Sequence, residues 1–493
     1  MRRTFFVFSL AIFGHLFLFP QTIFSQEQLG MRLERCAGIY GASVNPAHTA
    51  DNPNHWEISL FTGEVFFQNN YAYLRSTNLS QALRNTDNIV SVVDTTWENP
   101  PPPGAVLADY FEGTRPMRAV VQARVTGPAC SIRLGENNII GLVTALRTEI
   151  SAYHIPEILA YRTVSDVPRN QIIRIPSVGI TGMVWREIGL HYSSSNTDSD
   201  VHTAWGVSPK WLTGYEGFQV QAVTGFEYTQ RYNDTVALGR ANWDYAFTTG
   251  NIDNSDSIRV RKQGKGMGLD VGVTWAKPSD REENGYAWRL GISLLDLGSV
   301  RFRNTADRHH IGLDTTVTVT AGDFPSRDNA SEVWRDVSQA FLGAPEASLL
   351  GHSFTVGLPT ALSVQFDVEV VHRVFVGALL TQRVPLLQRS LKRPNTLAVV
   401  PRFEHRWGSL SLPIVLNDWQ SLRLGMAARL GWLYLGTDNM GSYVKKKKLT
   451  GGDVYIGLKI NAFSMGLRRR GSVSGGHSTR SGRNLRKIKC YEF

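Results

Sequence analysis

Two stretches near the C-terminal end of the chain alternate between apolar residues and charged or small ones. In the first, the even-numbered positions from Leu422 to Tyr434 are apolar, and the positions between them up to Gly431 carry Arg, Gly and Ala. The second stretch repeats this pattern from Val454 to Ala462. A period of two indicates β-strands with one apolar and one polar face. Such strands are typical of a membrane-spanning barrel, whose apolar face meets lipid while its polar face meets water or a plug.

Similar patterns recur along most of the chain. They cover residues 56–73, 117–125, 139–152, 178–192, 218–228, 268–275, 288–302, 362–370, 374–380, 397–407 and 410–416. With shorter candidates they predict about fourteen strands, within a range of about 12 to 16. Charged residues make up 19% of the chain, below the roughly 25% of soluble proteins. The predicted fold class is an all-β, transmembrane antiparallel β-barrel with an N-terminal loop or plug segment.

The N-terminus has the pattern of a secretory signal. Arg2 and Arg3 precede an apolar run from Phe5 to Phe19, which is shorter than the roughly 20 residues of a membrane-spanning helix. The small Ser25 precedes the expected cleavage point. We predict a signal peptide over residues 1–25, an outer-membrane barrel over residues 26–463, and a basic, disordered tail over residues 464–493. The predicted location is the cell outer membrane.

The net charge of +10 is concentrated at the two ends of the chain. The signal holds two arginines, and residues 468–493 hold eight Lys or Arg and one Glu, which leaves only +1 for residues 26–467. This distribution excludes the broad basic face of a nucleic-acid-binding protein. The tail and the run Lys445 to Lys448 are candidate contacts for lipopolysaccharide or peptidoglycan. Outer-membrane lipid is an expected partner, and an envelope protein is an alternative one.

Three cysteines permit one disulfide in an oxidising compartment and leave one cysteine over. Cys36 and Cys130 are the predicted pair because both lie in the N-terminal third of the chain. Cys490 would then be free.

Three short motifs of turn-forming residues lie beside predicted strands. They are Asn45-Pro46-Ala47, Asp296 with Gly298, and Asp438 with Asn439. With the spacing of the strands over residues 37–463, these motifs resemble those of FadL-type barrels. The chain is more closely similar to an uncharacterised outer-membrane barrel family of the Bacteroidota, and distantly similar to barrels associated with type IX secretion. We expect the Asp296 carboxylate to cap backbone amides while Gly298 permits a bend; a functional role for Asp296 is the alternative.

The resemblance implies one of two functions. The first is transport of hydrophobic or small solutes through an open or gated lumen. Its candidate lining residues, on the expected inner faces of strands, are Gln219, Gln221, Glu227, Arg423 and Arg429. The second is a non-enzymatic scaffold for protein secretion, gliding or surface-protein attachment, which tolerates a lumen filled by side chains. The chain contains no G-x-S-x-G elbow, P-loop or H-E-x-x-H motif, so we predict no enzymatic activity, cofactor or metal site.

Counting strands back from a periplasmic C-terminus leaves one conflict. The count places the long 304–351 segment at the periplasmic end and the short turn at His372 and Arg373 outside. Barrels normally have short periplasmic turns and longer external loops. Either one strand is miscounted or the long segment is a periplasmic element.

Overall fold

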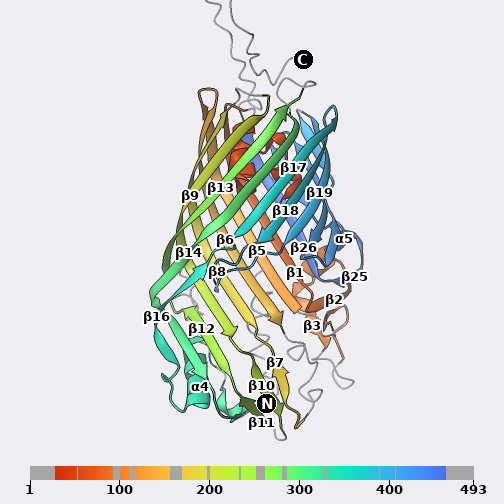
Figure 1. The fold of residues 1–493 in the computed structure, drawn as a ribbon. Helices are drawn as coiled ribbons and strands as arrows, with labels where there is room; N and C mark the ends of the chain where they lie inside the picture. The colour runs from red at the N-terminus through yellow and green to blue at the C-terminus, as the bar shows by residue number, and fades with distance from the viewer. Residues whose placement is uncertain are drawn as a thin grey trace, which may run out of the picture.

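The computed structural model describes residues 28–461 except 53, 93–99, 112–116, 156–168, 197–199, 232–234, 251–260, 280–285, 326, 328–329, 388 and 406. Within these residues, fourteen antiparallel strands form a closed barrel (Figure 1). The predicted fold class and strand number are confirmed. The predicted signal peptide, tail and Cys490 lie outside the described residues.

Fourteen wall strands follow one another around the barrel. It consists of β1 (Trp56–Asn69), β5 (Met117–Leu134), β6 (Asn138–Ile155), β8 (Gly179–Asn196), β9 (His202–Ala222), β13 (Gly264–Pro278) with β12 (Asn242–Thr248), β14 (Tyr286–Gly312), β17 (Ala361–Val371) with β16 (Leu349–Gly357), β18 (Val374–Arg383), β19 (Thr396–His405), β20 (Gly408–Ser411) with β21 (Ile414–Asn417), β22 (Ser421–Leu424) with β23 (Met426–Leu430), β24 (Leu433–Thr437) and β26 (Gly451–Asn461). Strands joined by "with" are segments of one wall strand, because both segments lie against the same neighbouring wall strand. Pairing of β1 with β26 closes the barrel.

Side chains along the wall alternate between the lumen and the outer surface. In β8, for example, Trp185 and Glu187 are buried, whereas Arg186 and Leu190 are exposed. Large exposed apolar side chains recur on the outer face of many wall strands, as at Leu422, which is 73% exposed. A closed barrel with an apolar outer face leaves no unpaired strand edge and suits a lipid surrounding.

None of the helices in the described residues combines the length and the apolar character that a membrane crossing requires.

The two ends of the barrel differ in the length of their connections (Figure 1). At one end, called the short-turn end, the connections are brief, as at His372 and Arg373 between β17 and β18. β1 begins and β26 ends there. The other end, called the long-connection end, carries every long excursion, including the one between β14 and β16. The segment 304–351 and the His372 turn therefore lie at opposite ends, as expected for an outer-membrane barrel.

The conflict in the strand count came from a miscounted strand. The sequence pattern predicted one strand from Leu422 to Tyr434, but the chain turns at Gly431, whose φ is +60°, and returns as β24. Leu430 and Leu433 pair directly across this turn. The turn reverses which positions face outward, and Tyr434 is buried in the lumen. A run of four apolar residues, 432–435, hid the reversal.

An extension projects from one side of the long-connection end, at the bottom of Figure 1, where β9, β12, β14 and β16 continue together. A four-stranded sheet belongs to it, consisting of β7 (Ile173–Ile175), β10 (Phe226–Gln230), β11 (Thr235–Gly239) and β15 (Val317–Thr320). After β15 the chain continues through η7 (Ala321–Asp323) into α4 (Ala330–Leu342). Val337 and Phe341 of α4 pack with Tyr245 and Ile311.

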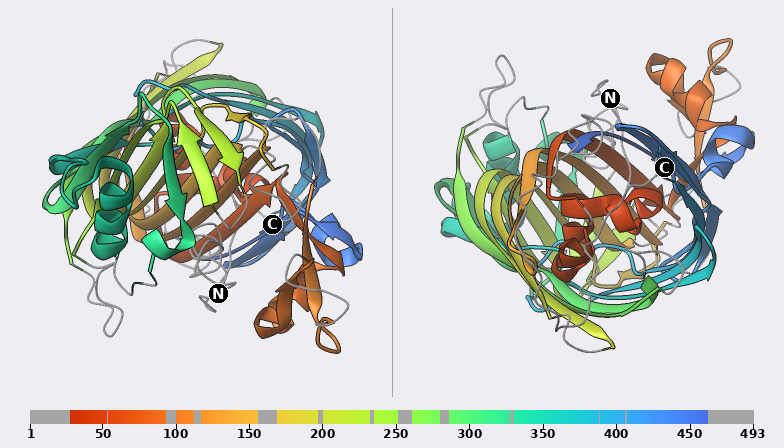
Figure 2. Two further views of the ribbon diagram at one scale, coloured as in Figure 1. Left: turned by 90° about the horizontal axis from the view of Figure 1, so that it is seen from below. Right: turned by 90° about the horizontal axis from the view of Figure 1, so that it is seen from above.

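A second unit, called the lateral unit, projects sideways from the barrel near β1 and β26 (Figure 2). It is a four-stranded sheet of β2 (Ala72–Thr77), β3 (Ile89–Ser91), β4 (Val106–Tyr110) and β25 (Lys447–Leu449). Three short helices accompany the sheet: α3 (Leu79–Arg84), η3 (Thr86–Asn88) and α5 (Gly441–Val444).

The first described residues lie inside the barrel. They form α2 (Leu29–Arg32), η1 (Arg35–Ser43) and η2 (Pro46–Asp51). Seen along the barrel axis, these helices lie within the ring of strands (Figure 2). Residues 28–52 are called the plug below.

Candidate functional site

The plug contacts wall strands around the circumference of the lumen. Four ion pairs between described residues join it to the wall, at N–O distances of 2.6 to 3.6 Å. They are Arg32–Glu64, Glu34–Arg429, Arg35–Glu404 and Asp51–Arg289. The wall partners come from β1, β23, β19 and β14. The plug is therefore held on several sides by charged groups that the wall directs inward.

The Asn45-Pro46-Ala47 motif seats the plug against three neighbouring strands. Asn45 caps η2 by accepting a hydrogen bond from the Ala47 nitrogen, and its Nδ2 donates to Gln365 Oε1 at 3.0 Å. Gly272 and Gly291 face this side chain. A Cβ atom on Gly272 would lie 2.9 Å from Asn45 Cγ, and one on Gly291 would lie 2.8 Å from Asn45 Nδ2. The motif thus needs wall glycines to fit.

A chain of hydroxyl groups and one imidazole joins η2 to the wall. Thr49 Oγ1 lies 2.6 Å from His191 Nε2 and 2.7 Å from Ser193 Oγ. His191 Nδ1 in turn lies 2.8 Å from Ser208 Oγ on β9. All four side chains are buried. This arrangement fixes the orientation of the plug relative to β8 and β9.

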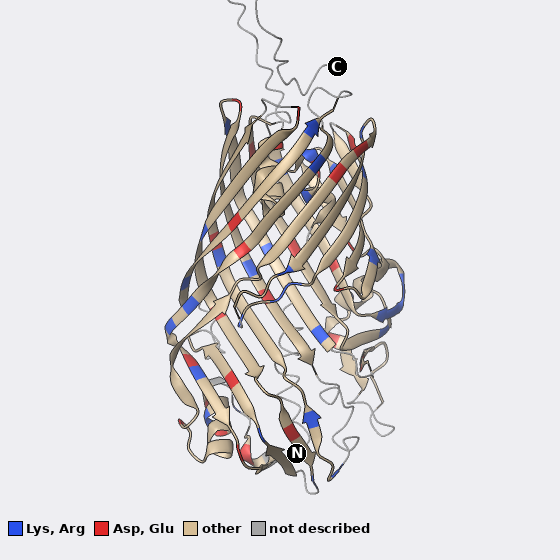
Figure 3. Cartoon of the chain, viewed as in Figure 1, with Lys and Arg blue, Asp and Glu red and all other residues tan. Residues whose placement is uncertain are grey.

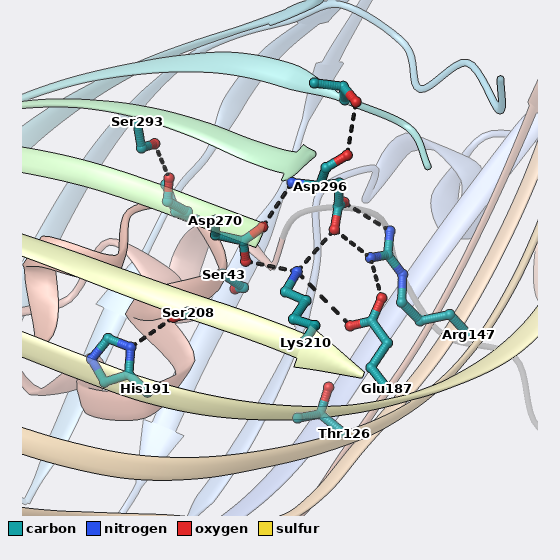
Figure 4. A network of polar contacts seen from close by, with 12 residues as sticks. Ser43, Thr126, Arg147, Glu187, His191, Ser208, Lys210, Asp270, Ser293 and Asp296 are labelled. Atoms are coloured by element: carbon teal, nitrogen blue, oxygen red, sulfur yellow. Dashed lines mark hydrogen bonds and ion pairs between the residues drawn. The ribbon is translucent and has the colours of Figure 1, made fainter. Parts of the chain in front are cut away.

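Asp296 is the centre of a charged network in the lumen (Figure 4). Its carboxylate accepts hydrogen bonds from Arg147 at 2.8 Å, Lys210 at 2.9 Å and Arg393 at 2.8 Å. The expectation that this carboxylate caps backbone amides is therefore wrong. Its three partners come from β6, β9 and the β18–β19 connection, so Asp296 joins distant parts of the wall.

Two further carboxylates balance the network. Lys210 Nζ lies 2.6 Å from Asp270, and Arg147 Nη1 lies 2.9 Å from Glu187. A carboxylate of Asp270 also accepts a hydrogen bond from the Asp296 backbone nitrogen at 2.7 Å. Three carboxylates and three basic groups of the network thus pair with one another inside the lumen.

The backbone at Asp296 and Gly298 explains why Asp296 reaches the network. Asp296 has φ +55° and Gly298 has φ +149°. The register between β13 and β14 shifts here, and Leu358 donates its N–H to the Gly298 carbonyl at the junction of β16 and β17. A Cβ atom on Gly298 would lie 2.9 Å from Gly268 Cα and nearer still to the Met267 carbonyl. The bend expected at Gly298 lies beside a β-bulge, which Leu295 and Asp296 form opposite Asp270.

A small cavity of about 40 Å³ lies between the plug and the network. It is lined by Tyr40 and Ser43 of the plug and by Arg124, Lys210 and Asp270 of the wall. Each buried water needs roughly 10–15 Å³ of such space. This cavity has room for a few waters and none for a solute.

Four of the predicted lining residues lie on wall strands. Gln219 and Arg423 are buried, and the Arg423 guanidinium stacks over the Phe66 ring at 5.3 Å. Gln221 is half-buried near the end of β9. Arg429 is buried and bound to the plug through Glu34.

Two other predictions need correction. Glu227 lies in β10 of the extension, outside the barrel wall, where it pairs with exposed Arg174 at 3.4 Å. The single strand predicted over residues 218–228 is broken at Gly225, whose φ is +76°.

The third motif, Asp438 with Asn439, holds the start of the β24–β26 connection. Asp438 donates its backbone N–H to Asp453, and the Asn439 N–H donates to Thr437 Oγ1.

The predicted disulfide between Cys36 and Cys130 is absent, and both thiols are free. Cys130 is exposed, whereas its neighbours Ala129 and Ser131 in β5 are buried. Its side chain therefore faces the outer surface. Cys36 lies in the plug, on the opposite side of the wall, so the two sulfur atoms cannot meet.

Several residues of the site were missed by sequence reasoning. Lys210, Glu187, Asp270 and Arg393 were not singled out as candidates. Three of them lie at inward positions of wall strands. For Lys210 and Asp270, a charged residue between apolar neighbours was the available signal. For Arg393, in a connection, the sequence offered no such signal. In the described part of the chain, no group of three or more His, Cys, Asp or Glu is placed to hold a metal ion.

The structure resembles a TodX monoaromatic hydrocarbon channel mutant (9% identity, TM-score 0.40, covering 86% of this chain and 94% of that one). It also resembles a FadL homologue of Pseudomonas aeruginosa (11% identity, TM-score 0.39, covering 89% and 98%). The comparison with curated proteins finds no match. A family model matches residues 46–438, and the chain therefore belongs to the family of unknown function DUF5723.

Proposed function

We propose that the protein is a gated outer-membrane pore for small polar solutes, in which the plug is the gate. One observation carries the proposal: the plug is joined to the wall by ion pairs and hydrogen bonds along its length. Water can replace such contacts when the plug moves, because charged and hydroxyl groups are well solvated. The plug also packs Leu29, Leu33 and Val44 against apolar residues of the wall, so opening would expose these side chains as well.

The wall residues that surround the plug support the choice of solute. Its inward side chains include Glu57, Glu64, Arg289, Glu404 and Arg429, all of them buried and charged. With the plug displaced, these groups would face water and form a polar lining. The resemblance suggested hydrophobic or small solutes. Small polar solutes fit the charged part of this lining, and Leu379 and Val400 add an apolar part.

The orientation follows from the connections. Outer-membrane barrels have short turns on the periplasmic side and longer loops outside. The short-turn end is accordingly periplasmic in this proposal, and the extension and lateral unit face the cell exterior.

A plug locked to the wall tests the proposal. Thr49 Oγ1 and Ser193 Oγ are 2.7 Å apart, so the pair Thr49→Cys with Ser193→Cys places two sulfur atoms within bonding reach. The background carries Cys36, Cys130 and Cys490 as serine. In planar lipid bilayers we expect brief openings from the reduced protein and none from the oxidised one, with conductance restored by reductant. Each single cysteine variant, treated with the same oxidant, is the control.

A deletion of residues 28–52 provides the second arm. Folding is checked by the difference in gel mobility between heated and unheated samples. A folded, plug-free barrel should conduct continuously. If that barrel is folded and does not conduct, or if oxidation leaves the conductance of the double-cysteine variant unchanged, the pore proposal fails.

A scaffold function is the second candidate, and the folded units at the long-connection end favour it. The extension has its own apolar cluster around Tyr245 and Phe341, and the lateral unit has another around Leu79 and Leu449. Such folded units present ordered surfaces to which an envelope protein can bind. Contacts of Lys445 to Lys448 or of the tail with cell-surface polymers would belong to this function. A stoichiometric protein partner retained by the non-conducting barrel would support it.

A further inference from the structure

Exposed basic side chains form a row on the outer face of the barrel. Arg186 in β8, Lys265 in β13 and Arg301 in β14 are all exposed. Arg186 pairs in register with Thr213 of β9, Thr213 pairs with Lys265, and Lys265 pairs with Arg301. The three basic residues therefore occupy one register row across four adjacent strands, called the basic row below.

The side chains of the basic row point away from the lumen. Arg186 lies between buried Trp185 and Glu187, and Arg301 lies between Val300 and Phe302, which are both 0% exposed. Residues that alternate with buried ones along a strand face the opposite side. None of the three forms an ion pair with a described acidic residue. On a barrel surrounded by lipid, such charges are costly at the bilayer midplane and tolerated at its interfaces.

The distance along β13 places the basic row at an interface. Trp275 is the last outward aromatic of β13 towards the short-turn end, and ten residues separate it from Lys265. Ten residues span roughly 34 Å along a strand, which is about 26 Å across the membrane for a strand tilted by about 40°. The apolar band of an outer-membrane barrel is about 25 Å tall. The row thus lies where the apolar band ends on the long-connection side.

The next row towards the short-turn end is apolar in β8, β9 and β13 and continues as Ser299 in β14. Ile188, Trp211 and Met267 follow one another in register, and Met267 is 67% exposed. Basic groups therefore lie immediately beside an apolar surface. Basic residues are also visible on this side of the wall where β14 passes into the extension (Figure 3).

We propose that the basic row binds the phosphate groups of lipids in the leaflet at the long-connection end, while the apolar row beneath it contacts their acyl chains. Lys and Arg are the usual partners of lipid phosphates, and Arg can bind a phosphate through two N–H groups. Neighbouring strands are about 4.8 Å apart, so β8 and β14 are separated by roughly 14 Å along the wall. This length accommodates a lipid that carries two phosphates.

Native mass spectrometry of the full-length protein with added lipid tests this site. The probes are diphosphoryl lipid A and the zwitterionic lipid phosphatidylethanolamine. The test variant is Arg186→Gln, Lys265→Gln and Arg301→Gln together. The matched control is Lys445→Gln, Lys446→Gln and Lys447→Gln, which removes the same charge from exposed residues of the lateral unit. Gel mobility confirms that both variants are folded.

We expect the test variant to bind lipid A about tenfold more weakly or worse, with phosphatidylethanolamine binding unchanged and the control close to the native protein. Equal losses in the two variants would show that overall charge attracts the lipid, and a greater loss in the control would place the site on the lateral unit. Unchanged binding in the test variant would also overturn the proposal. Displacement of lipid A by inorganic phosphate alone would show a simple anion site without acyl-chain contact.

Discussion

Gly206 of the barrel wall lies directly against the backbone of Ala47 in the plug. A Cβ atom on Gly206 would lie 2.6 Å from the Ala47 nitrogen, and the Pro46 carbonyl group is equally close. The obstacle is backbone, which cannot rotate away as a side chain can. The fit of the Asn45-Pro46-Ala47 motif is therefore decided by a glycine more than 150 residues away in the sequence.

The substitution Gly206→Ala should loosen the plug. Overpacking typically costs about 1–3 kcal/mol, and here the plug can move away more easily than the wall. We expect increased conductance in planar bilayers and a small loss of barrel stability. The control is Gly189→Ala in the neighbouring strand, where the nearest atom to an added Cβ is 3.5 Å away. If both variants conduct alike, the contact with Ala47 does not hold the plug.

The substitution Asp296→Asn should strongly destabilise the barrel. Arg147, Lys210 and Arg393 would lose the carboxylate that they share, and breaking a buried ion pair from one side costs about 3–5 kcal/mol. Asparagine tolerates a positive φ well, so the variant tests charge and not backbone strain. Urea unfolding in lipid vesicles measures the effect.

Glu149→Gln is a suitable comparison for that variant. Glu149 lies 3.8 Å from Arg147, so its removal leaves Arg147 with two closer carboxylates. We expect a loss well below that of Asp296→Asn. Equal losses would mean that Asp296 is not the centre of the network.

The cysteines should remain thiols under oxidising conditions. Because the wall separates Cys36 from Cys130, non-reducing peptide mapping should find no peptide that links the two. A membrane-permeant maleimide should label Cys130 in the native state and label Cys36 much more slowly, since Cys36 lies within the lumen. A linked peptide, or equal labelling rates, would contradict the described position of the plug.

The lateral unit should lose stability in acid through Asp109. Although burial opposes its ionisation, hydrogen bonds from Tyr73 and Arg75 hold the pKa of Asp109 below its usual range. A carboxyl group with a lowered folded-state pKa stabilises the fold above its unfolded pKa of about 3.9. This contribution is lost as the pH falls through the lower, folded-state value.

Hydrogen exchange of β2 and β4, corrected for the intrinsic rate at each pH, measures this dependence. At pH 7 the backbone amides of β2 and β4 should be less protected from exchange in the variant Asp109→Asn than in the native protein. The difference should stay constant down to about pH 4 and shrink below it. A difference that is independent of pH down to pH 2 would exclude the carboxylate as its cause.

Alternation of apolar and polar residues was sufficient to predict a barrel of about fourteen strands. This works because each wall strand has one face towards lipid and one towards the lumen, and that requirement acts on every second residue. The Asp296–Gly298 motif separately predicted a bend, since a glycine inside a strand often marks a local irregularity. The bulge itself lies at Leu295 and Asp296.

Alternation of apolar and polar residues failed to locate two places where the chain turns. The turn at Gly431 was missed because apolar residues continue through it, and Glu227 was assigned to the wall because the pattern resumes after Gly225. In both places the chain changes direction over two or three residues, which leaves little trace in a period of two.

Tertiary structure alone decided which side chains meet inside the lumen. Asp296 meets Arg147, Lys210 and Arg393 across sequence separations of 149, 86 and 97 residues. Cys36 and Cys130 are closer in sequence than Asp296 and Arg147, yet the wall separates them. The periodicity of a strand sets which face a side chain occupies, but closure of the barrel sets which faces oppose one another across the lumen. Charge pairing and plug docking depend on that second relation.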